Sequence, residues 1–179
     1  MFLFGGSGAS LPAHPGMTPG NYYSTVMDGP IGTLPALANT LYGILFYNPV
    51  QATYTKIGVN VSVLGVGNAR LGIYSNNSGI PGSLILDAGT VSVSTTGDKE
   101  ITISQVLASG WYFLVLLPSV AVTVTAVVPT TPENFLGSVS SGVLATTGFT
   151  ASQAFGALPN NFPTPTAINT AIPRLWLRL

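Results

Sequence analysis

Apolar residues alternate with small polar residues in several short stretches of the chain, and this period of two constrains the fold more than any other feature. In residues 56–63 the apolar positions are Ile57, Val59, Val61 and Val63, with Lys, Gly, Asn and Ser between them. Successive side chains of a strand point to opposite faces, so the pattern predicts a β-strand that buries these four residues. No stretch shows a convincing helical period of 3.6, and the sequence therefore predicts an all-β protein.

The same reasoning predicts further strands between turn residues. They fall at residues 40–47, 69–74, 84–87, 91–93, 99–104, 110–117, 121–128 and 174–179, with turns at 65–68, 76–79 and 95–98. Residues 110–117 are apolar on both faces, which is typical of a central strand. Eight or nine closely spaced strands favour an antiparallel β-sandwich of jelly-roll type. Residues 135–172 contain several Gly and Pro residues and are expected to form loops.

The first 38 residues differ in composition from the rest. Prolines at positions 12, 15 and 19 exclude a helix there, because each proline removes a hydrogen-bond donor and restricts the residue before it. We expect residues 1–38 to form an extended arm and residues 39–179 to form the β-sandwich domain. The arm carries an apolar tip, Phe2, Leu3 and Phe4, and the pair Tyr22 and Tyr23. These five residues are candidates for binding a partner.

Charge is scarce: the chain of 179 residues has five Lys and Arg, five Asp and Glu, and no net charge. Five dispersed cations cannot form the basic stripe that nucleic acids require, so no nucleic-acid partner is expected. The absence of Cys excludes disulfides and Cys-based zinc sites. The longest apolar run, residues 111–117, stops at Pro118 and is far shorter than the roughly 20 residues of a membrane-spanning helix, so no membrane partner is expected.

Few residues suit catalysis. His14 is the only imidazole, and its place among small residues and prolines indicates a solvated or interface histidine. Asp98 and Glu100 share a face of their strand, as paired carboxylates of glycoside hydrolases must, but their position beside a turn is typical of a solvated hairpin end. We therefore predict a non-enzymatic protein without cofactor or metal. A calcium ion on Asp87 or Asp98 remains an alternative, although no calcium-loop motif occurs.

The C-terminal strand is a second candidate for partner binding. Leu175, Leu177 and Leu179 alternate there with Arg174, Trp176 and Arg178. The leucine face is expected to join the sheet, and the Arg–Trp–Arg face is expected to be exposed. Tryptophans and tyrosines also form platforms for sugars, but aromatic residues in strands more often pack in cores or between subunits. We interpret Trp176 as a contact for a protein partner.

The outward positions of the predicted strands are mostly Ser, Thr, Asn and Gly. A monomer with so few charges lacks the repulsion that keeps proteins apart, and it presents neutral strand edges. In a symmetric oligomer, by contrast, each charge near the axis meets its own copy, so neutral polar surfaces pack more easily. The composition indicates a subunit of a homo-oligomer, with a trimer as the expected state.

Several motifs in residues 40–179 resemble a β-sandwich module common in virion proteins of tailed bacteriophages. They are residues 68–74 (NARLGIY), 79–90 (GIPGSLILDAGT), 99–103 (KEITI), 110–112 (GWY), 156–159 (GALP) and 173–179 (PRLWLRL). The resemblance implies a virion protein, assembled in the cytoplasm of the bacterial host, and supplies no catalytic residues.

Two roles are compatible with this module. The short arm favours a capsid decoration or cement protein that contacts the major capsid protein or other virion subunits. The alternative is a receptor-binding domain of a tail fibre or tail tip that recognises a glycan of the host surface.

Overall fold

The computed structural model describes residues 16–25, 29–129, 136 and 146–179. These residues form thirteen strands: β1 (Tyr22–Ser24), β2 (Ile31–Ala36), β3 (Thr40–Asn48), β4 (Ala52–Val63), β5 (Asn68–Asn77), β6 (Ile80–Ser92), β7 (Gly97–Leu107), β8 (Gly110–Pro118), β9 (Val122–Val127), β10 (Gly148–Ser152), β11 (Thr166–Ile168), β12 (Ile172–Pro173) and β13 (Leu175–Arg178). No helix in this part of the chain is long and apolar enough to cross a bilayer.

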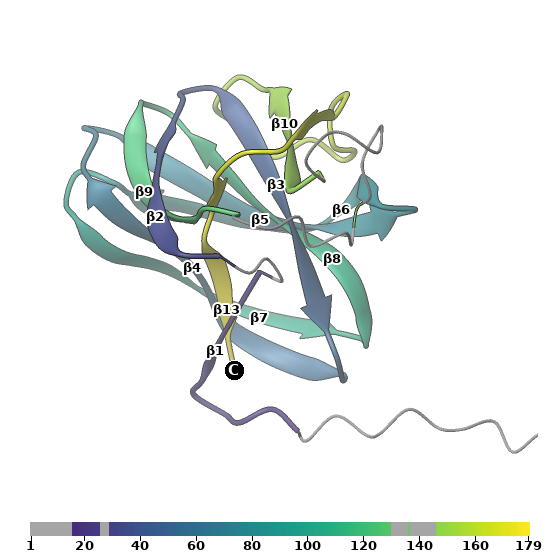
Figure 1. Ribbon diagram of the computed structural model, residues 1–179. Helices are drawn as coiled ribbons and strands as arrows, with labels where there is room; N and C mark the ends of the chain where they lie inside the picture. The colour runs from purple at the N-terminus through teal and green to yellow at the C-terminus, as the bar shows by residue number, and fades with distance from the viewer. Residues whose placement is uncertain (1–15, 26–28, 130–135, 137–145) are drawn as a thin grey trace, which may run out of the picture.

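Strands β2 to β9 form two facing antiparallel sheets (Figure 1). One sheet has the order β2–β9–β4–β7 and the other has the order β3–β8–β5–β6. Between β2 and β9, the chain crosses from one sheet to the other at every connection except the hairpin between β5 and β6. This alternation is the topology of a jelly roll, and the predicted antiparallel β-sandwich is confirmed.

The C-terminal segment enters the first sheet where β4 and β9 diverge. These two strands pair only through Val61 and Val63 of β4. Beyond that point β13 pairs with β4 and β12 pairs with β9. The C-terminal strand thus joins the sheet, as its alternating leucines predict: Leu175 and Leu177 are fully buried.

The expectation that residues 135–172 form only loops is wrong. Strand β10 extends the second sheet by pairing with β3, and β11 pairs with β10. Strands β10, β11 and β12 have five, three and two residues. Runs this short show no recognisable period, so only their pairing partners identify them as strands.

Two strands also lie within residues 1–38, where an extended arm is expected. Strand β1 pairs with β13, and β2 pairs with β9 along its whole length. Strand β2 contains Pro35, which hides it from sequence analysis. Its position at the edge of the sheet tolerates a residue that cannot donate a ladder hydrogen bond. The apolar tip, Phe2 to Phe4, lies outside the described residues, as does His14.

Two details of the strands differ from expectation because of irregular register. Residues 84–87 and 91–92 belong to one long strand, β6, whose pairing with β5 shifts near Gly89 at a φ of 90°, and Val93 follows the end of this strand. Val63 was expected to be buried but is 58% exposed. The register shifts between Val61 and Val63, and a shift of this kind turns the following side chain away from the core.

The second sheet is buried on both faces. Its inner face packs against the first sheet in the main core, which includes Ile44, Ile73 and Leu114. On the outer face, β10 adds Phe149 beside Phe113, and the loop after β10 packs over these strands with Leu158, in a second core. Residues Phe113 to Leu117 of β8 are therefore all inaccessible to solvent, as the apolar run predicts.

Candidate functional site

Half of the ten charged residues of the chain gather on one surface, the outer face of β7, β4, β13 and β1. The strand register aligns Glu100, Gly58, Trp176 and Ser24 in one row across these strands. A neighbouring row contains Lys56, Arg178 and Tyr22. We call this surface the charged face; it comprises Tyr22, Lys56, Asp98, Glu100, Arg174, Trp176 and Arg178.

Both carboxylates of the charged face have partners. Glu100 forms an ion pair with Lys56 at 2.5 Å. Partial burial raises the pKa of Glu100, but the hydrogen bond and charge of Lys56, together with Tyr22 and Arg178, outweigh this and hold the pKa below its usual value. Asp98 accepts a hydrogen bond of 2.6 Å from the Asn60 amide. The two acids share a face, as predicted, and Glu100 is already engaged in the ion pair with Lys56.

Trp176 is buried, which contradicts the expectation that it is exposed. Only 7% of its surface is accessible. Its indole lies against Gly58 of β4, where an added Cβ would come within 2.5 Å of Trp176 Nε1. Tyr22 of β1 packs edge to face with the indole at a centroid distance of 6.2 Å. Because residue 58 is a glycine, the indole of Trp176 fits against the backbone of β4, and Tyr22 of β1 covers it from the side. Trp176 is therefore buried although it lies on the outward face of the sheet.

Tyr22 itself is half exposed, and the Arg178 guanidinium lies 5.3 Å from the centroid of its ring. Arg178 also donates a hydrogen bond from Nε to the carbonyl of Gly20 at 3.1 Å. Tyr23 points the other way and packs against the main core. The two tyrosines predicted as one binding pair therefore lie on opposite faces of β1.

A hollow of about 230 Å³ opens on the charged face. Tyr22, Ser24, Asp98, Arg174 and Trp176 line it. The Arg174 guanidinium makes no hydrogen bond or ion pair with any residue that the structure describes. The hollow thus combines an aromatic wall, a carboxylate and a guanidinium without a partner among the described residues, which suits a small polar ligand.

A second hollow, of about 460 Å³, is neutral. It lies beside the turn between β5 and β6 and is lined mainly by small polar side chains and prolines. The lining residues are Ser75, Asn76, Asn77, Ile80, Pro81, Gly82, Ser83, Asn161, Phe162 and Pro165. It offers hydrogen bonds but no charge.

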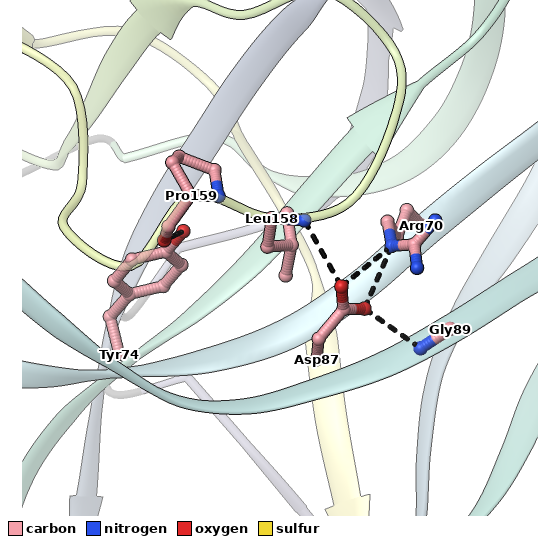
Figure 2. A network of polar contacts seen from close by, with 6 residues as sticks. All are labelled: Arg70, Tyr74, Asp87, Gly89, Leu158 and Pro159. Atoms are coloured by element: carbon pink, nitrogen blue, oxygen red, sulfur yellow. Dashed lines mark hydrogen bonds and ion pairs between the residues drawn. The ribbon is translucent and has the colours of Figure 1, made fainter.

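Figure 2 shows a polar network that fastens the loop after β10 to the outer face of the second sheet. Arg70 Nε contacts both oxygens of Asp87, at 2.7 and 3.0 Å. Asp87 also accepts hydrogen bonds from the backbone N–H groups of Gly89 and Leu158, both at 3.0 Å. The Tyr74 hydroxyl donates to the Pro159 carbonyl at 2.7 Å.

This network is structural, and sequence analysis did not identify it. Burial raises the pKa of Asp87, but the hydrogen bonds from Arg70, Leu158 and Gly89 and the charge of Arg70 bring the pKa below its usual value. Because both carboxylate oxygens are occupied, Asp87 is a poor candidate for a calcium ligand. The sequence does contain a signal from which this ion pair could have been predicted. The predicted turn at residues 76–79 makes Arg70 and Asp87 near neighbours across one hairpin.

No group of three potential metal ligands occurs in residues 16–25, 29–129, 136 and 146–179. Comparison with known proteins finds no matching family model, no matching curated protein and no matching solved structure. The fold and surface define a jelly-roll protein with one charged face. The similarity to phage virion modules remains a prediction from sequence.

Proposed function

We propose that the chain is a non-enzymatic structural subunit of a bacteriophage particle, where it decorates or cements the capsid as a homotrimer. The observation that carries the proposal is an apolar end of the jelly roll, where the only charge at the described connections is the Lys99 ammonium of β7, held by Thr95 and Thr96. The connections 37–39, 64–67, 93–96 and 119–121 meet there, joined by backbone hydrogen bonds such as Gly65 N to Val93 O and Asn39 N to Pro118 O. None of these connections contains a charged residue.

Four aliphatic side chains at this end face solvent. Leu37, Val63, Leu64 and Val66 are 60%, 58%, 48% and 84% exposed. Clustered apolar exposure on a soluble domain marks an interaction surface, because water contact with such groups is unfavourable. The scarcity of charge around these four side chains allows copies of the same surface, or a neutral partner, to approach with little repulsion.

Two further observations support a virion role. The jelly roll is an architecture that viral capsid domains and lectin domains share, although a fold by itself assigns no function. Independently, the sequence motifs of residues 40–179 resemble phage virion modules. The sequence and the fold thus point in the same direction for different reasons.

The test is to measure the copy number of the chain in purified particles that carry its gene. Decoration predicts on the order of hundreds of copies, because symmetric shells repeat each binding site many times. A Val66→Asp variant should fold normally but lose self-association and particle binding. Thr164→Asp, which places the same charge in another exposed loop, serves as the control. Absence of the chain from particles, or full binding by Val66→Asp, contradicts the proposal.

A receptor-binding domain of the tail is the second candidate. The observation that favours it is the hollow on the charged face, where Tyr22, Asp98 and Arg174 come together. This role predicts few copies per particle and binding of the isolated protein to the host envelope. Copy number therefore separates the two functions.

A further inference from the structure

We propose that the hollow on the charged face binds a sugar bearing a carboxylate, with Arg174 holding the carboxylate and Asp98 a ring hydroxyl. The inference rests on the second function above and names its ligand class. It follows from the charges, the wall and the size of the hollow.

The charges favour a monoanion. Lys56 and Glu100 neutralise each other in their ion pair, and Arg178 is engaged with Gly20 and the Tyr22 ring. Asp98 and Arg174 remain at the hollow, and no ion pair joins them among the described residues. The charged face as a whole carries three cations and two carboxylates, so it has one cation in excess. A planar guanidinium binds a carboxylate with two parallel hydrogen bonds.

The remaining groups suit a sugar ring. The Asn60 amide holds Asp98 Oδ1, which leaves Oδ2 available to accept a hydrogen bond from a hydroxyl. The half-exposed Tyr22 ring offers an apolar wall against which C–H groups can pack. The volume of about 230 Å³ lies below the range of about 300–1,000 Å³ typical of drug-sized ligands, which favours a single ring over a longer chain.

The hollow also has its own spectroscopic reporter. The chain has two tryptophans, Trp111 and Trp176, and Trp176 lines the hollow. In a Trp111→Phe variant, tryptophan fluorescence reports on the hollow alone. Ligand-detected NMR with the unaltered chain gives the same comparison if that variant does not fold.

The experiment compares five probes: glucuronic acid, galacturonic acid, glucose, galactose and acetate. Both sugar acids should bind more tightly than the matching neutral sugars and than acetate. Arg174→Gln should weaken the sugar acids by about tenfold or more while leaving the neutral sugars unchanged, because it removes only the charge-assisted contact. Asp98→Asn should weaken acids and neutral sugars alike. Lys99→Gln, which removes a cation that contacts Thr95 and Thr96, is the control.

Three results overturn the inference. They are no binding of either sugar acid at about 10 mM, equal binding of acidic and neutral sugars, and unchanged binding by Arg174→Gln. Acetate binding as tight as that of the sugar acids indicates an anion site only and also overturns it. None of these results bears on copy number, so a failure here leaves the receptor-binding and decoration roles to be decided separately.

Discussion

The two outer faces of the sandwich differ in whether other parts of the chain cover them. The outer face of β3, β8 and β5 is apolar and is covered by the chain itself, through the loop after β10. The outer face of β7, β4, β13 and β1 carries half of the charges of the sequence and remains open at a hollow. One face is closed by internal packing, whereas the other keeps an open hollow.

The ion pair that the described residues form on each face illustrates the same difference. Arg70 and Asp87 hold a covering loop in place through the backbone N–H group of Leu158. Lys56 and Glu100 link only neighbouring strands and leave the surface above them uncovered. The ion pair of the covered face thus attaches a loop to the sheet, whereas the ion pair of the open face joins two neighbouring strands. Four predictions test this comparison.

The largest effect is expected in the second core. Phe113→Ala removes a ring that is inaccessible to solvent and packs against Phe149 at a centroid distance of 5.8 Å. The cavity should lower the free energy of unfolding by about 3–5 kcal/mol in urea denaturation. Val66→Ala, at a position that is 84% exposed, should change it by less than about 0.5 kcal/mol. Equal effects would mean that the covered face does not contribute to the fold.

A smaller effect is expected at Gly58 on the open face. Gly58→Ala places a Cβ 2.5 Å from Trp176 Nε1 and 2.9 Å from the Lys99 carbonyl. The crowding should cost about 1–3 kcal/mol of unfolding free energy and expose Trp176, which shifts its fluorescence to longer wavelength. Gly156→Ala is the matched control, because a Cβ there meets only one atom, at 3.9 Å. An unshifted emission spectrum would contradict the packing of Trp176 on Gly58.

The third prediction concerns acid. The pKa of Asp87 is lower in the native state than in the unfolded chain. Its ionised form therefore stabilises the protein at pH values above the ordinary aspartate pKa of about 3.9. This stabilisation is lost as the pH falls through the lower native pKa. Asp87→Asn should therefore cost about 1–2 kcal/mol at pH 7. Thermal melts of both proteins should converge below about pH 4. A constant difference at every pH would exclude the ionised carboxylate as the cause.

The smallest effect is expected for Lys56→Gln. The side chains of Lys56 and Glu100 are 32% and 20% exposed, so the pair is partly screened by solvent and should contribute less than about 1 kcal/mol. Because the pKa of Glu100 is also lowered, this contribution should disappear once acid protonates the carboxylate, and it should shrink in about 1 M salt. A loss larger than that of Asp87→Asn would reverse the comparison between the two faces.

Sequence analysis predicted the parts of the fold in which one residue pattern suffices. The alternation in β4 and β9 and the continuous apolar run of β8 identified these strands and most of their buried residues. It failed at β1, β2 and β10 to β12, which are short or interrupted by proline and are recognised as strands only through the strands with which they pair. The exposure of Val63 was missed because a bulge depends on the partner strand.

The candidate site shows the same division. Period two placed Asp98 with Glu100, and Arg174 with Trp176 and Arg178, each set on one face of its own strand. Nothing in the pattern indicated that the two sets meet across Gly58, or that Tyr22 covers Trp176. Burial of Trp176 depends on residues from β1 and β4, which lie far from it in the chain.

The sequence alone determined that this chain forms sheets with an unusually neutral surface, because strand periodicity and charge are local properties that each residue carries with it. Which face became covered and which remained open was decided only by tertiary structure. That outcome depends on where the ends of the chain pair: β1 and β13 at the edge of β4, and the segment after β10 over β8 and β5. This pairing depends on apolar surface and free strand edges that distant parts of the chain provide. It therefore cannot be read from the sequence of any one segment.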